Sequence, residues 1–103
     1  MRLWHITLIS FKNKAQQSIK DEAYRRLLAL CENCGGREAG ILFWGVGKNI
    51  DLRKGIHLVV ISIFKNKKAL EKYKQHLKHK ELTDLLSQVA DWQDGDIWVQ
   101  GSL

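Results

Sequence analysis

The sequence has no long apolar run, although 45% of its 103 residues are hydrophobic. Its uninterrupted apolar runs, such as residues 58–61, are far shorter than the ~20 residues that a membrane-spanning helix needs. The opening residues, Met1 to His5, do not start the apolar segment of a signal peptide. We therefore expect a cytoplasmic protein without a membrane segment.

Cysteine is also scarce, with only Cys31 and Cys34 in the chain. Two cysteines this close together do not make the disulfide framework of a small secreted protein. A zinc site would need a second pair of ligands at a recognisable spacing, and the sequence has none. The pair lies at the C-terminal end of a predicted helix, where the helix dipole opposes a thiolate. We predict no metal and no cofactor, and the role of Cys31 and Cys34 stays open.

The chain is basic, with a formal net charge of +6 and a pI of about 9.5. The excess is concentrated between Lys65 and Lys80 rather than in a tail. A segment of this kind is more often a solvated helix face than a phosphate-binding surface. Its role stays open, and we expect nucleic acid not to be a partner.

Length and residue periodicity predict one α+β domain over residues 1–103. Helices are expected at residues 15–31, ended by Gly35-Gly36, and in two stretches after Asn66. Asp94-Gly95-Asp96 is a turn signal, so the last strand is expected to be short, over residues 97–99. The other strands are predicted at residues 3–11, 40–46 and 56–64.

This βαββαβ order is that of the ferredoxin-like fold, in which a four-stranded antiparallel sheet carries its helices on one side. The first and third strands are apolar on both faces. The uncovered face would then expose several hundred Å² of apolar surface, more than a soluble monomer usually shows. A second copy could cover it by burying ~800 Å² per partner. We therefore predict a homodimer, with the two sheets forming a dimeric α/β barrel.

Several segments resemble those of the stress-responsive A/B-barrel (Dabb) family of the dimeric α+β barrel superfamily. Residues 4–12 resemble its histidine-led first strand, and Gly47-Lys48-Asn49 resembles its glycine-x-asparagine turn. Residues 57–64 and 69–79 resemble its third strand, its following helix and its Tyr-x-x-His-Pro-x-His segment. The sequence departs from that pattern at Leu77, where the family usually has proline, and in its more polar last strand.

The resemblance implies candidate site residues. Some family members, of the olivetolic-acid cyclase type, use a tyrosine and a histidine of this segment in an aldol closure, and the matching positions are Tyr73 and His79. A histidine can remove a proton next to a carbonyl while a phenol holds the enolate oxygen. His5 could line the same cavity and orient the substrate or His79 by hydrogen bonding. Tyr73, His79 and His5 are therefore the candidate catalytic residues.

Three functions stay open at this point. The first is a homodimer that binds a small, largely apolar or aromatic molecule between sheet and helices, with or without cyclase (lyase) chemistry by Tyr73 and His79. The second is a non-catalytic stress-response or structural dimer, in which Tyr73 and His79 form a structural pair. The third is RNA binding, since the RNA recognition motif has the same element order. It is disfavoured because Ile56 and Leu58 stand where aromatic rings would stack on bases.

Overall fold

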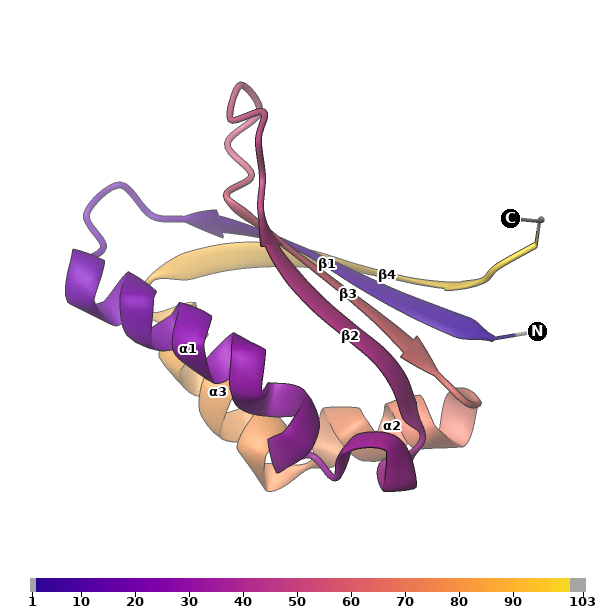
Figure 1. The fold of residues 1–103 in the computed structure, drawn as a ribbon. Coiled ribbons are helices and arrows are strands. Elements are labelled where there is room, and N and C mark those ends of the chain that lie inside the picture. The colour runs from indigo at the N-terminus through magenta and orange to yellow at the C-terminus, as the bar shows by residue number, and fades with distance from the viewer. Residues whose placement is uncertain (1, 101–103) are drawn as a thin grey trace.

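A computed structural model describes residues 2–100. Three α-helices and a short 3₁₀ helix pack on one face of a four-stranded antiparallel sheet of order β2-β3-β1-β4 (Figure 1). The elements are β1 (Leu3–Phe11), α1 (Gln17–Asn33), η1 (Gly36–Ala39), β2 (Ile41–Lys48), β3 (Leu58–Phe64), α2 (Lys67–Gln75), α3 (Leu77–Ser87) and β4 (Ala90–Trp98). The predicted ferredoxin-like α+β fold is confirmed.

The core lies between the helices and the inner face of the sheet. Along β3 the inner positions are Leu58, Val60, Ser62 and Phe64, all buried, and they alternate with half-buried residues of the outer face. Helix α1 adds Ala23, Leu27 and Leu30 to this core. The indole Nε1 of Trp44 on β2 donates to the backbone carbonyl of Leu27 at 2.9 Å, which fixes α1 against the sheet. Burial of apolar side chains on this one face holds the layers together.

The outer face of the sheet carries no helix (Figure 1). On the two central strands most residues that point to it are apolar, and they form pairs such as Ile6 with Ile61 and Leu8 with Val59. Polar residues of this face lie toward one end of β1 and β4, at Ser10, Asp91 and Gln93. Phe43 and Ile97 on the edge strands are about half exposed, at 51% and 52%. The prediction that the first and third strands are apolar on both faces is therefore confirmed.

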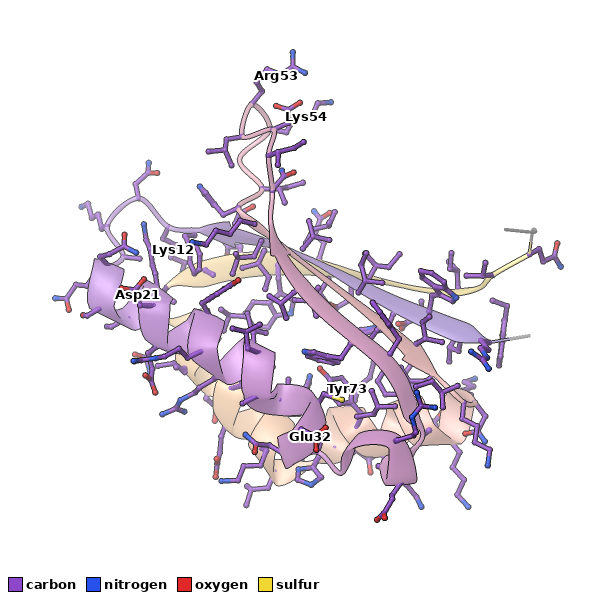
Figure 2. The ribbon with its side chains drawn as sticks, in the orientation of Figure 1. Lys12, Asp21, Glu32, Arg53, Lys54 and Tyr73 are labelled. Carbon is purple, nitrogen blue, oxygen red and sulfur yellow. The ribbon has the colours of Figure 1, made fainter. Side chains whose placement is uncertain are left out.

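The connection between β2 and β3 extends away from the helices, with Arg53 and Lys54 at its tip (Figures 1 and 2). The side-chain amide of Asn49 closes its base by donating to the carbonyls of Asp51 and Ile56, at 2.7 and 2.9 Å. The turn predicted at residues 47–55 is shifted by two residues: Gly47 and Lys48 still pair with β3, and β3 begins at Leu58.

The prediction of a turn at Asp94-Gly95-Asp96 is wrong. These residues lie inside β4, which pairs with β1 along its whole length, with Thr7 opposite Asp94 and His5 opposite Asp96. Local composition favours a turn there, but a fully extended neighbouring strand supplies a partner for every residue of β4. The predicted three-residue strand is therefore a nine-residue strand.

No helix among residues 2–100 is long and apolar enough to cross a membrane.

Candidate functional site

A small cavity lies between the inner face of the sheet and helices α1 and α3, and its volume is about 60 Å³. Its wall is mostly apolar, with side chains such as Leu27, Val60 and Leu86. All three predicted site residues, His5, Tyr73 and His79, line it. The structure thus brings together one residue from β1, one from α2 and one from α3.

Tyr73 is placed on the inner face of α2 by the spacing of Ala69, Leu70 and Tyr73, the three buried residues of that helix. Helix α2 begins at the predicted cap, where Oδ1 of Asn66 accepts from the backbone N–H of Ala69 at 2.9 Å. Figure 2 shows Tyr73 in the interior, between helices and sheet. Its ring contacts Phe64, Trp44 and His79, with centroid separations of 5.2, 5.8 and 4.6 Å.

The Tyr73 hydroxyl remains protonated across the physiological pH range. Burial raises the pKa of this phenol, and the nearby thiol of Cys34 and the Asp94 carboxylate raise it further. Residues 2–100 contain no fully enclosed side-chain N or O atom without a hydrogen-bond partner. The Tyr73 hydroxyl makes no hydrogen bond to those residues, so it is not fully enclosed, and the Tyr73 side chain lines the cavity. Tyr73 is therefore a hydrogen-bond donor that can serve a ligand.

His79 lies in the first turn of α3, and His76 is the single residue that separates α3 from α2. The backbone of His76 is extended, with φ −64° and ψ 139°, and its own ring caps α3 because Nδ1 accepts from the backbone N–H of Lys78 at 3.1 Å. This cap produces the bend without the proline that the Dabb pattern has at position 77. The bend turns His79 back toward Tyr73.

The tautomer of His79 follows from its hydrogen bond. Nδ1 lies 3.1 Å from the backbone carbonyl of Lys74, which can only accept, so Nδ1 carries the hydrogen and Nε2 has a lone pair. The pKa of His79 is lowered, first by burial and also by the nearby His5 ring, although the Lys74 carbonyl opposes this shift. His79 is therefore a neutral imidazole at pH 7, with a basic nitrogen free to act.

His5 is buried on β1 and is held by the strand beside it. Nδ1 of His5 pairs with Oδ1 of Asp96, and its Nε2 lies 3.4 Å from the hydroxyl of Thr7, which donates to Asp94 at 2.7 Å. The second oxygen of Asp96 accepts from the ammonium of Lys74 at 2.9 Å. Within residues 2–100 the ring thus bonds to Asp96 and Thr7, and not to His79 as one reading of the sequence allowed.

Asp94, Asp96, Thr7 and Lys74 are site residues that the sequence reasoning missed. For the two aspartates, the sequence pattern that could have revealed them is the alternation of Trp92, Asp94, Asp96 and Trp98. This alternation puts the four side chains on one face of an extended strand. Because Gly95 favours a turn, the sequence analysis did not recognise this alternation as a strand.

The two cysteines are free thiols at the C-terminal end of α1. Burial raises the pKa of Cys34 to about 11, with a backbone N–H of His79 acting against this, and burial also raises the pKa of Cys31. Both thiols are therefore protonated at neutral pH.

The fold and the cavity together define a ferredoxin-like α+β protein with a site lined by two histidines, a tyrosine and one carboxylate, Asp94. The family described as the stress responsive A/B barrel domain matches residues 3–98, so the chain belongs to that family. No curated protein matches the chain significantly in sequence.

Solved structures share this fold at low sequence identity. A dimeric ferredoxin-like protein of unknown function from Thermobifida fusca superposes with a TM-score of 0.80 at 15% identity, covering 96% of this chain and 92% of that one. A protein from Arabidopsis thaliana gives 0.79 at 19% identity, covering 98% of both chains. SnoaB, a cofactor-independent oxygenase from Streptomyces nogalater, gives 0.76 at 11% identity, covering 99% and 96%. At these identities the likeness shows the fold.

Proposed function

We propose that this protein is a homodimer that binds a small, largely apolar carbonyl compound between sheet and helices and catalyses enolisation with aldol closure. One observation carries the proposal: a neutral His79 with a free Nε2 lies in ring contact with Tyr73, whose side chain lines the same cavity and whose hydroxyl has no hydrogen-bond partner within residues 2–100. A base and a donor side by side in a mostly apolar cavity match what such a reaction needs.

The chemistry follows from the two protonation states. Nε2 of His79 takes a proton from the carbon next to a carbonyl, and the electron pair of that C–H bond becomes the C=C bond of an enolate. The Tyr73 hydroxyl donates a hydrogen bond to the enolate oxygen. The enolate carbon then attacks a second carbonyl, forming the C–C bond, and the resulting alkoxide recovers the proton from the His79 imidazolium. His5 borders the same space, and Asp96 and Thr7 fix the orientation of its ring, so His5 shapes the polar side of the cavity.

The size of the cavity restricts the substrate. Sites for drug-sized ligands usually have ~300 Å³ or more, whereas this one has about 60 Å³. A small dicarbonyl compound is therefore a better candidate substrate than a long polyketide chain, and a small ketone is enough to test the enolisation step.

The dimer part of the proposal rests on the outer face of the sheet. Its apolar residues would cover a matching face on a second copy around a two-fold axis. The structural relative from Thermobifida fusca is a dimeric ferredoxin-like protein, which supports the same arrangement here.

The small cavity also favours a second candidate, a non-catalytic stress-response or structural dimer in which Tyr73 and His79 are a packed pair. Nucleic-acid binding has less support. Leu58 faces the helices, and the outer positions of β3 are Val59, Ile61 and Ile63, so this strand offers no ring to stack on a base.

Hydrogen exchange of small ketones tests the catalytic part. Proton NMR in D2O would follow loss of the α-hydrogen signal of methyl ketones from butanone to acetophenone. We expect the wild type to accelerate exchange of a fitting ketone, His79→Gln to abolish this and Tyr73→Phe to slow it by about a hundredfold or more. His76→Asn is the matched control, because it changes a histidine outside the cavity and keeps a capping side chain. Equal exchange rates in wild type, His79→Gln and Tyr73→Phe would exclude the catalytic function and favour the non-catalytic dimer.

A further inference from the structure

A second, larger cavity lies beside the N-terminal half of α1, and its volume is about 330 Å³. It is bounded by α1, by the end of β1 and by the base of the connection between β2 and β3. Asp21, labelled in Figure 2, marks the helix side of this region. The volume falls within the range of small-molecule sites, ~300 to 1,000 Å³, which the Tyr73 cavity does not reach.

Two lysines with no acidic partner line this cavity. Nζ of Lys20 lies 5.5 Å from the ring centroid of Phe11, and Nζ of Lys48 lies 5.4 Å from that of Tyr24. Within residues 2–100 neither ammonium forms an ion pair. Asp21 is the one carboxylate among the described lining residues, and it already accepts from the side-chain amide of Gln17 at 2.9 Å. The lining therefore has more positive than negative charge.

His57 adds a neutral donor to the same wall. Its Nδ1 accepts from the backbone N–H of Phe11 at 2.9 Å, so the hydrogen of the neutral ring is on Nε2. The ring of His57 lies against that of Phe11, with centroids 5.7 Å apart and planes inclined by 37°. Ring faces and positive N–H donors thus share one cavity.

We propose that this cavity is a second ligand site, specific for a small aromatic anion such as an aromatic carboxylate. A planar ring would pack on Phe11 and Tyr24, whose faces also hold the two lysine side chains. The carboxylate would accept from Lys20 and Lys48, which lack such a partner, and from Nε2 of His57. The site shares no described lining residue with the Tyr73 cavity and does not depend on the proposed reaction.

Titration with 2-naphthoate tests this site, with 2-naphthamide as an uncharged probe of the same shape. We expect saturable binding of 2-naphthoate, with the largest amide NMR shifts at residues of the second cavity, and at least tenfold weaker binding of 2-naphthamide. Lys48→Met and Lys20→Met each keep the length of the side chain and remove the charge. Each should weaken 2-naphthoate binding by about tenfold, the usual effect of losing one charge-assisted hydrogen bond.

Lys54→Met is the matched control, because Lys54 lies at the tip of the connection and loses the same charge away from the cavity (Figure 2). It should bind 2-naphthoate like the wild type, and so should Tyr73→Phe. The proposal is overturned if 2-naphthoate does not saturate at millimolar concentration, if Lys54→Met weakens binding as much as Lys48→Met, or if the shifts map to the Tyr73 cavity. Thermal melting of each variant verifies that the fold is intact.

Discussion

The hydrogen bond from Nδ1 of His79 to the backbone carbonyl of Lys74, 3.1 Å long, spans the break between α2 and α3. Lys74 lies in the last turn of α2, where backbone carbonyls lack a partner within the helix. Its ammonium holds Asp96 at 2.9 Å, and Asp96 in turn pairs with His5. One residue of α2 therefore positions both histidines of the cavity, one through its backbone and the other through its side chain.

Substitution Lys74→Met separates these two contacts, because it keeps the backbone carbonyl and removes the ammonium. The pKa of Asp96 is lowered overall: burial raises it, but the hydrogen bonds from His5 and Lys74 outweigh burial. Without Lys74 that pKa should move up, and stability at pH 7 should fall by about 0.5–1 kcal/mol, since the ion pair is partly exposed. Carbon-detected NMR titration of the Asp96 carboxyl and urea unfolding measure the two effects.

The lowered pKa of Asp96 determines how this carboxyl changes folding stability with pH. A carboxyl with a lowered folded pKa stabilises the fold above its unfolded pKa of about 3.8, and this is lost as pH falls through the lower folded value. The gap in stability between wild type and Lys74→Met should therefore close in strong acid. Lys72→Met, on the same helix, is the control and should leave the titration of Asp96 unchanged. A wild-type titration curve for Asp96 in Lys74→Met would contradict the contact.

His79 should make the protein less stable in mild acid. Its pKa in the fold is below the ordinary 6.5, mainly because of burial, so the unfolded chain binds a proton at pH values where the fold resists it. Stability then falls as pH drops from about 6.5 to the folded pKa, by at most about 1.4 kcal/mol per pH unit from this group. Urea midpoints between pH 7 and pH 5 measure this slope.

Substitution His79→Gln should flatten that part of the pH profile, because glutamine does not titrate. The control His76→Asn leaves His79 in place and should keep the wild-type contribution of that group. If wild type and His79→Gln lose stability equally between pH 6.5 and pH 5, the imidazole is not held neutral by the fold.

Substitution Leu77→Pro should be tolerated or stabilising, by up to about 1 kcal/mol, since proline restricts the unfolded chain. Leu77 is the first residue of α3, where a missing N–H costs least, and its side chain is 66% exposed. His76 already has the extended backbone that a residue before proline prefers. Urea unfolding measures the change.

The matched control is Lys80→Pro, one turn further into α3. The N–H of Lys80 donates to the carbonyl of His76 at 3.0 Å, so proline there should cost about 3 kcal/mol or more. A loss of similar size in Leu77→Pro would mean that the bend at His76 depends on leucine.

The proposed dimer predicts that Ile61→Asp is a monomer. Ile61 lies on the outer face of the central strand β3, opposite Ile6, so a second copy would bury the new carboxylate without a partner. One chain has a mass of 11.9 kDa. Analytical ultracentrifugation should show the wild type at twice this mass and the variant at the mass of a single chain.

Leu28→Asp is the control for that experiment. Leu28 is half exposed on α1, on the helix side of the sheet, and receives the same charge away from the proposed interface. It should remain a dimer. A wild type that sediments as a monomer at high concentration, or a dimeric Ile61→Asp, would exclude this face as the interface.

Much of the fold was predictable because the responsible signals are local. The two-residue alternation of β1 and β3, the amphipathic pattern of α1 and the Asn66 cap each depend on residues close together in the chain. The Dabb resemblance placed Tyr73 and His79 in one segment, and a short bend is enough to bring their rings together.

The polar side of the cavity was not predictable in the same way. Asp94 and Asp96 look like turn residues beside Gly95, and only pairing with β1 makes them a strand that faces the site. The contact between His5 and Asp96 joins residues 91 positions apart, so no local pattern encodes it. The second cavity likewise needs the end of β1, α1 and the base of the β2–β3 connection to meet.

The sequence by itself determined the order of the elements, the two-sided apolar strands and the positions of Tyr73, His79 and His5 on them. Only the tertiary structure decided which carboxylates hold His5, which nitrogen of His79 is free, and where a larger cavity opens. The physical reason is that side-chain periodicity acts within a few residues, whereas strand register and helix packing bring distant residues together.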